Sequence, residues 1–198
     1  MKRFFASACV GLLSLAAAHA VEVGKPAPDF KAKNVKGETV SLSDYKGKIV
    51  VLEWNNFECP FVRKHYGSGN MQKLQETYTG KGVIWLTVNS AAAGKQGNLP
   101  ADSAADKVSK EGSKATAYLL DSDGAVGKAY GAKTTPHMFV INKDGNLIYD
   151  GAIDSINSPK PEDLPKAENY VAKAVDAALE GKPVETSKTQ PYGCGVKY

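Results

Sequence analysis

The stretch IVVLEWNNFECPFVRK (residues 49–64) decides the fold, because in it a strand passes into a helix at a cysteine. Residues 49–54 are largely apolar and rich in β-branched side chains, as in a central strand that is covered on both faces. Pro60 favours the first helical position, where a missing N–H costs nothing. Cys59 therefore stands between the end of a strand and the start of a helix.

This position favours a reactive thiol at Cys59. A helix N-terminus carries roughly half a positive charge and free N–H groups, and both stabilise the thiolate, which is the reactive form of cysteine. Arg63, one helical turn further on, is expected to add a second positive charge, whereas Glu58 acts in the opposite direction. The alternative is an inert buried cysteine, which is a common fate of this residue type.

The rest of the chain alternates between strand and helix patterns. It has 198 residues, 42% hydrophobic and 23% charged, with net charge +4, which suggests one main domain. The basic residues form no cluster, so nucleic-acid binding is not expected. Expected strands are 37–48 with a turn, 49–54, 82–89, 116–121, 138–142 and 147–153; expected helices are 60–78 with an interruption at 67–70, 101–112, 123–131 and 166–181. Such an order predicts an α/β fold with a mixed central sheet.

The N-terminus has the pattern of an export signal. Lys2 and Arg3 precede an apolar run, and Ala18-His19-Ala20 has the small-x-small form of a cleavage site. The apolar run is short for a membrane span of about 20 residues, although an uncleaved anchor is the alternative. We expect a signal peptide at 1–20, a domain at 21–181 and a tail at 182–198. The mature protein is then periplasmic or secreted, without a membrane span.

Several motifs resemble the thioredoxin-fold redoxins, the broad group that includes the peroxiredoxin (alkyl hydroperoxide reductase/thiol-specific antioxidant) proteins. They are VGKPAPDF (23–30), GETVSLSDYKGK (37–48), IVVLEWNNFECPFVRK (49–64), LLDSDGAVGKAYGAKTTPHMFVINKDG (119–145) and LIYDGAI (147–153). The resemblance implies a thioredoxin-like fold, thiol-dependent oxidoreductase chemistry, and a cis Pro136 beside the reactive cysteine. It implies protein thiols and disulfides or a peroxide as substrates, an external thiol as reductant, and no cofactor or resident metal. The oligomeric state is left open.

Two departures from these families bear on activity. Thioredoxins use a Cys-x-x-Cys pair, but Val62 occupies the second position here, which excludes a dithiol cycle within that motif. Peroxiredoxins carry Thr or Ser three residues before their peroxidatic cysteine, and Asn56 stands there instead. An amide donates and accepts hydrogen bonds, so Asn55 and Asn56 are candidate substitutes. The candidate substrate-binding residues are Asn55, Asn56, Pro60 and Thr135.

Cys194 is the candidate partner of Cys59. It lies between Gly193 and Gly195 in a tail without periodicity, so we expect an accessible thiol on an unstructured extension that can return to the active site. Removal of residues 1–20 would also remove Cys9 and leave these two cysteines, which an oxidising compartment allows to pair. Cys194 then either resolves an oxidised Cys59, forms a permanent structural disulfide, or pairs with a second chain.

Other polar residues have two readings each. Glu53 in the central strand is either a buried proton acceptor or a hydrogen-bonded strand residue. His65 is expected to face solvent or to be structural, and His137 either contributes to the site or points away.

One alternative function is a copper site formed by Cys59, Cys194 and His137. A third possibility is a non-catalytic binding module with a structural disulfide. Trp85 and Tyr149 are expected in the core.

Overall fold

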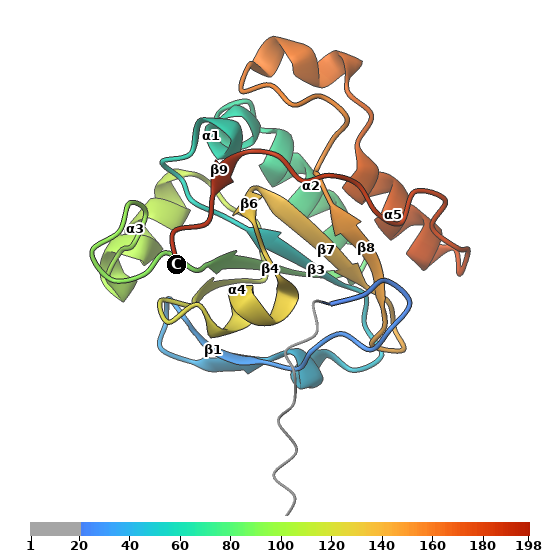
Figure 1. Ribbon diagram of the computed structural model, residues 1–198, viewed down its shortest axis with the longest axis horizontal. Helices are drawn as coiled ribbons and strands as arrows, with labels where there is room; N and C mark the ends of the chain where they lie inside the picture. Colours follow the sequence, from blue (N-terminus) through green and yellow to red (C-terminus); the bar gives the residue numbers. More distant parts are fainter. Residues whose placement is uncertain (1–20) are drawn as a thin grey trace, which may run out of the picture.

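A computed structural model describes residues 21–198 of the chain, and the proposed signal peptide lies outside the described residues. A seven-stranded sheet with strand order β2-β1-β5-β4-β3-β7-β8 forms the centre of the molecule (Figure 1). Its strands are β1 (Lys31–Asn34), β2 (Thr39–Ser41), β3 (Val50–Trp54), β4 (Ile84–Asn89), β5 (Ala117–Leu120), β7 (His137–Ile141) and β8 (Leu147–Gly151). The helices are α1 (Pro60–Gly67), α2 (Asn70–Thr79), α3 (Ala101–Lys110), α4 (Ala125–Tyr130) and α5 (Tyr170–Leu179).

The strand directions confirm the predicted mixed sheet. β3 is parallel to β4 and β4 is parallel to β5, while β3 is antiparallel to β7 and β7 to β8. Parallel neighbours require helical crossovers, and antiparallel neighbours can be joined by a tight turn. The β7–β8 hairpin has such a turn at the expected Asp-Gly dipeptide, where Gly145 has a φ of 82°. The arrangement is the thioredoxin-like α/β fold predicted from the motifs.

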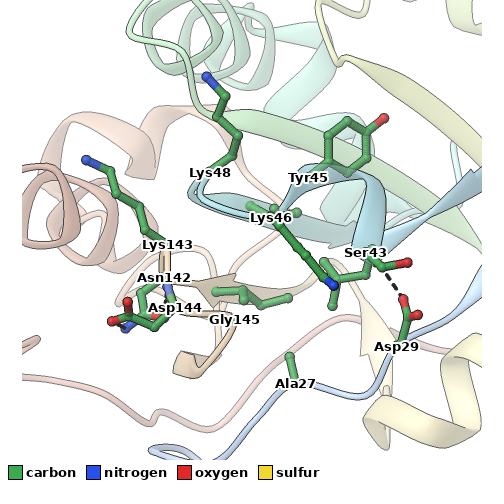
Figure 2. Close-up of a pocket in the computed structure, with 13 residues that line it drawn as sticks. Ala27, Asp29, Ser43, Tyr45, Lys46, Lys48, Asn142, Lys143, Asp144 and Gly145 are labelled. Carbon is green, nitrogen blue, oxygen red and sulfur yellow. Dashed lines mark hydrogen bonds between the residues drawn. The ribbon is translucent and has the colours of Figure 1, made fainter.

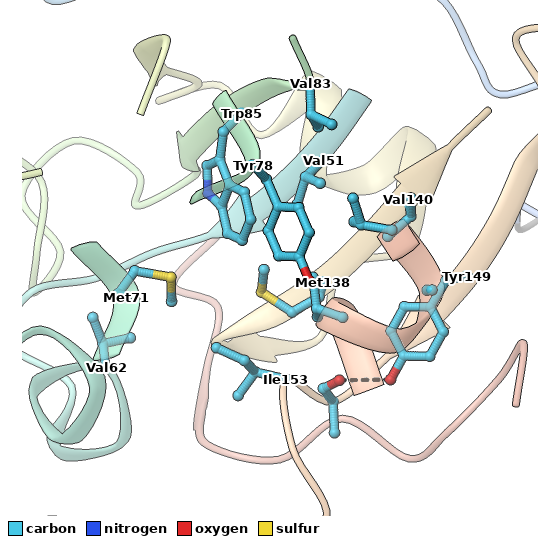
Figure 3. Packing of buried hydrophobic residues seen from close by; sticks show 14 of the residues in the cluster. Val51, Val62, Met71, Tyr78, Val83, Trp85, Met138, Val140, Tyr149 and Ile153 are labelled. Carbon is cyan, nitrogen blue, oxygen red and sulfur yellow. Dashed lines mark hydrogen bonds between the residues drawn. The ribbon is translucent and has the colours of Figure 1, made fainter. Parts of the chain in front are cut away.

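The central strands separate two apolar layers, because successive side chains point to opposite faces. On one face, Val51 and Trp85 pack with Tyr78 of α2 and with residues of α1 and α5 (Figure 3). On the other face, Leu52 and Trp54 pack against Tyr130 of α4 and its neighbours. Trp85 and Tyr149 are fully buried, as predicted.

Three segments before the C-terminal tail differ from the predicted elements. β1 was not predicted, because KAKN contains poor strand formers and is held by pairing with β2 and β5. The linker expected at 158–165 contains a 3-10 helix, η2 (Pro161–Lys166). The last helix begins at Tyr170 rather than 166, because the Asn169 side chain caps it by accepting a hydrogen bond from Ala172 N.

The largest difference concerns the C-terminal tail. Residues 187–198, here called the strap, return from α5 across the active-site end of the sheet and form β9 (Cys194–Gly195) against β6 (Thr134–Thr135) (Figure 1). The tail returns to the active-site end of the sheet, as the sequence argument allowed. It is not unstructured, however, because the strap makes specific backbone hydrogen bonds that no sequence periodicity announces. Within residues 21–198, the helices are too short and too polar for any of them to cross a bilayer.

Candidate active site

Cys59 occupies the N-cap of α1, as its place between a strand and a proline predicted. Its backbone carbonyl accepts the hydrogen bond of Arg63 N at 2.9 Å, which closes the first helical turn. The side chain is only 1% exposed. The Cys59 thiol donates a hydrogen bond to the carbonyl oxygen of Thr135, with a separation of 3.0 Å.

The strap places Cys194 beside this thiol. Thr135 precedes a cis peptide bond to Pro136, as the resemblance implied, and it pairs with Cys194 across the two-stranded β6–β9 ladder. The Thr135 hydroxyl donates to the carbonyl oxygen of Cys194 at 3.4 Å. Both cysteines carry free thiols, and the Cys194 side chain is near enough to the Cys59 sulfur to lower the pKa of Cys59. Cys59 and Cys194, which are 135 positions apart in the sequence, thus both contact Thr135.

The surroundings give the two thiols opposite acidities. Burial raises the pKa of Cys59, but hydrogen bonds from Cys194, from Thr135 and from the helix more than offset this effect, so the pKa lies below its usual value. Burial and the neighbouring Cys59 sulfur raise the pKa of Cys194 to about 11. Cys194 therefore keeps its proton at neutral pH, and Cys59 is the more acidic thiol of the two. Cys59 is the better nucleophile of the pair.

Gly193 makes this approach of the strap possible. Its φ is 132°, which L-residues with a side chain rarely adopt, and an added Cβ would lie 2.1 Å from the Thr135 carbonyl oxygen. That oxygen is the one that accepts the Cys59 thiol hydrogen bond. The sequence argument treated this glycine only as a source of accessibility, and its role in close packing was missed.

The other predicted residues are placed differently. Arg63 is exposed, and its side chain makes no hydrogen bond or ion pair within residues 21–198. The expectation that its charge stabilises the thiolate therefore has no support in the geometry. Pro60 is exposed at the first position of α1, beside Cys59, and Thr135 is buried beneath the strap.

The asparagines expected to bind substrate are buried, and their side-chain amides form hydrogen bonds within the protein. Asn55 donates to Glu53 at 3.1 Å and is itself 1% exposed. Asn56 donates to Gln96 O at 3.2 Å and accepts from Glu58 N at 2.9 Å, so its amide ties the Cys59 loop to the 90–99 loop. In this arrangement both amides shape the loop before Cys59 and neither is presented to a substrate.

Glu53 is fully buried on the α1–α2 side of the sheet. Burial raises the pKa of its carboxyl group, and hydrogen-bond donors lower it in part. The donors are the side chains of Asn55, Tyr66, Gln75, Trp85 and Thr87. The residue is thus a hydrogen-bonded strand residue, and a role as proton acceptor stays a prediction.

The two histidines have internal partners. His65 is fully buried rather than solvent-facing; its Nδ1 accepts from the Asn70 amide at 2.8 Å. His137 points away from the thiols, because its Nε2 lies 2.8 Å from Asp150 Oδ1 and its Nδ1 accepts from Lys133 N.

The copper alternative does not fit this geometry. In the part of the chain that the structure describes, no three His, Cys, Asp or Glu side chains gather closely enough to hold a metal ion. Cys59, Cys194 and His137 therefore do not form the proposed ligand set.

A separate pocket lies at the opposite end of the sheet (Figure 2). Lys46 and Lys48, which precede β3, line it together with the turn between β7 and β8. Cys59 follows the other end of β3, so this pocket has no part in the thiol chemistry.

Sequence reasoning also missed a buried ionic cluster under the strap. Lys64 of α1 and Asp154 after β8 form an ion pair at 3.2 Å, with side chains 0% and 2% exposed. Tyr192 of the strap donates a hydrogen bond to the same carboxylate. The sequence gives no signal of this cluster, because nothing in it pairs Lys64 with Asp154.

Comparison with known proteins places the chain among redoxins. A family model described as the AhpC/TSA family matches residues 23–150. A thiol-disulfide oxidoreductase ResA from Bacillus thuringiensis subsp. konkukian is 28% identical over 130 residues, which cover 66% of this chain and 69% of the relative.

Two solved structures show the same fold. An uncharacterized conserved protein from Geobacillus kaustophilus has a TM-score of 0.77 at 29% identity, with 89% of this chain and 92% of that chain covered. A putative thiol:disulfide interchange protein DsbE from Chlorobium tepidum has a TM-score of 0.59 at 24% identity, with 81% and 99% covered. Because the family model matches well over half of the residues, from 23 to 150, the chain belongs to the AhpC/TSA family of thioredoxin-like redoxins.

Proposed function

We propose that this thiol-dependent oxidoreductase exchanges disulfides through Cys59 as nucleophile and Cys194 as resolving cysteine, within one chain. The observation that carries the proposal is the convergence of both cysteines on Thr135. Cys59, at a helix N-terminus, donates to the Thr135 carbonyl oxygen, and Cys194, on the strap, pairs with Thr135 in the β6–β9 ladder. Their opposite pKa shifts support the assignment of roles. The more acidic thiol, Cys59, attacks the substrate first, and the thiol that keeps its proton, Cys194, reacts in the second step.

The chemistry has two steps. The Cys59 thiolate attacks one sulfur of a substrate disulfide, and a mixed disulfide forms while the other substrate sulfur leaves as a thiolate. Cys194 then loses its proton and attacks the Cys59 sulfur. The Cys59–Cys194 bond forms, the second substrate sulfur leaves, and the two leaving thiolates take up protons. The substrate disulfide is reduced, the protein dithiol is oxidised, and an external thiol restores it.

Trapping distinguishes the roles of the two cysteines. A Cys194→Ser variant is expected to accumulate a mixed disulfide between Cys59 and a protein disulfide substrate, whereas a Cys59→Ser variant forms none. Peptide mass spectrometry of the mildly oxidised full chain should find Cys59 joined to Cys194. If oxidised peptides instead join two chains, or if both thiols stay free, the intramolecular cycle is refuted.

A peroxide is the alternative oxidant. Attack of Cys59 on a peroxide oxygen would give a sulfenic acid and release water or an alcohol, and Cys194 would condense with the sulfenic acid to the same disulfide and water. Comparison of hydrogen peroxide with a protein disulfide as oxidant of the reduced chain, by the rate of Cys59–Cys194 formation, separates the two. We favour the protein disulfide because Asn56 stands where peroxiredoxins carry a hydroxyl and its amide is engaged by Gln96 and Glu58.

Export to an oxidising compartment fits this chemistry and rests on the signal pattern of residues 1–20. Secretion of the full chain, followed by N-terminal sequencing, tests it. A mature N-terminus at Val21 is expected, and retention of the chain in the cytoplasm contradicts this proposal without affecting the thiol cycle.

A further inference from the structure

Asp154 lies in the loop after β8 and is 2% exposed, and both oxygens of its buried carboxylate have polar partners within the protein. Oδ1 accepts hydrogen bonds from Ile156 N at 3.0 Å and from the Tyr192 hydroxyl, while Oδ2 lies 3.2 Å from Lys64 Nζ and 3.7 Å from His65 Nε2. A buried carboxylate with this many partners is costly to disrupt, because every group that loses it is left desolvated.

The side-chain partners come from the two segments that carry the thiols. Lys64 and His65 lie on α1, whose N-cap is Cys59. Tyr192 lies on the strap, two residues before Cys194. Asp154 therefore joins the helix of one cysteine to the segment of the other through a single carboxylate.

Tyr192 is held in place by its ring as well as by its hydroxyl. Its ring centroid lies 5.8 Å from that of Phe61 in an edge contact, and Lys64 Nζ lies 5.8 Å above the ring. Burial next to the Asp154 carboxylate raises the pKa of Tyr192, so the hydroxyl stays protonated and donates. A two-residue arm spans at most about 7 Å, so an anchored Tyr192 confines the Cys194 backbone to a small region.

We propose that Tyr192 and Asp154 are positioning residues for Cys194: their hydrogen bond fastens the strap to α1, holds the resolving thiol against Cys59, and limits the access of solutes to Cys59. The inference rests on the proposed function for its resolving role. The shielding of Cys59 follows from its 1% exposure beneath the strap and does not depend on Cys194 chemistry.

Besides the β6–β9 ladder at Cys194 itself, other anchors hold the strap farther from the thiols. Thr189 Oγ1 accepts from Ala152 N at 2.8 Å, and the Tyr198 hydroxyl donates to Ala132 O at 2.9 Å. Loss of the Tyr192 hydroxyl is therefore expected to loosen the strap locally around Cys194 without detaching it. Local loosening lowers the effective concentration of one thiol at the other.

Tyr192→Phe is the sharpest variant, because it keeps the ring contacts and removes only the bond to Asp154. Tyr78→Phe is its matched control, since Tyr78 is also buried and also donates to an aspartate, Asp176, at 3.1 Å, but between α2 and α5. Asp154→Asn is less suitable, because it leaves Lys64 buried without its counter-charge and endangers folding.

The first measurement equilibrates the full chain and both variants with reduced and oxidised glutathione and quantifies the Cys59–Cys194 disulfide by peptide mass spectrometry. Tyr192→Phe is expected to lower the equilibrium constant for this disulfide about tenfold, which corresponds to about 1.4 kcal/mol. Tyr78→Phe is expected to leave it within about twofold of the unsubstituted chain, a difference of about 0.4 kcal/mol.

The second measurement uses a Cys194→Ser background and follows alkylation of Cys59 by iodoacetamide. Addition of Tyr192→Phe is expected to accelerate it about tenfold, and addition of Tyr78→Phe to leave it unchanged. Equal behaviour of the two tyrosine variants in both measurements overturns the inference. Absence of a Cys59–Cys194 disulfide in the unsubstituted chain refutes the resolving role and the proposed function with it, whereas the alkylation rates decide the shielding role separately.

Discussion

Gly193→Ala tests the closest contact in the candidate active site. An added Cβ would lie 2.1 Å from the Thr135 carbonyl oxygen and 2.8 Å from its carbon, both backbone atoms that cannot rotate away. To restore ordinary contact, the strap must move outward by roughly 1 Å. The φ of 132° adds strain for alanine, so we expect the docked strap to lose about 2 kcal/mol.

This loss acts directly on the disulfide, because Cys194 follows Gly193 in the chain. A penalty of about 2 kcal/mol lowers the effective concentration of the Cys194 thiol about 30-fold. The Cys59–Cys194 disulfide becomes less stable relative to the dithiol, and its reduction potential rises by about 40 mV. Equilibration of the full chain with glutathione, with peptide mass spectrometry as readout, measures the shift.

Gly195→Ala is the matched control on the other side of Cys194. Its added Cβ meets nothing closer than Lys133 O at 4.0 Å. We expect its potential to stay within about 10 mV of the unsubstituted chain, as for an ordinary surface substitution. If Gly193→Ala and Gly195→Ala shift the potential equally, close docking of the strap does not set the position of Cys194, and the reasoning is refuted.

The ionic cluster yields two further predictions. Lys64→Met is expected to destabilise the fold by about 3–5 kcal/mol, because it leaves the Asp154 carboxylate buried without its cation. Its control, Lys81→Met, removes a half-exposed pair with Asp176 and is expected to cost under about 1 kcal/mol. Urea unfolding measures both losses, and equal losses contradict the buried-pair argument. Burial also lowers the pKa of His65 to about 4, so on acidification the histidine is protonated in the unfolded state before it is protonated in the folded state. The free energy of unfolding is therefore unaffected by His65 above about pH 6.5 and falls by about 3 kcal/mol as the pH drops to about 4. In His65→Gln the slope of stability against pH over this window should flatten, and an unchanged slope excludes His65 as its source.

The fold was predictable because its signals are local. The β-branched run before Cys59, the proline after it and the Asp-Gly turn each specify an element through backbone geometry and burial within a few residues. The placement of Cys59 at a helix N-cap followed from the same signals. The short strand β1 was missed, because its stability comes from pairing with β2 and with the distant strand β5 rather than from its own residues.

The path of the tail could not be read in this way. Residues 182–198 show no hydrophobic periodicity, and their structure comes from contacts with β6, β8 and the loops around them.

The asparagines before Cys59 illustrate the same limit. Their chemistry suggested substrate binding, but tertiary neighbours such as Gln96 and Tyr118 use their hydrogen bonds.

By itself the sequence determined the α/β scaffold, the helix-start position of Cys59 and the presence of a second cysteine near the C-terminus, because each depends on local pattern or composition. Only the tertiary structure decided which groups surround that cysteine. The Thr135 carbonyl, Gly193 and the buried Asp154 cluster bring the two thiols together through contacts that join distant segments. Such contacts depend on how whole elements pack and on which buried charges they neutralise, and neither leaves a periodic trace in the chain.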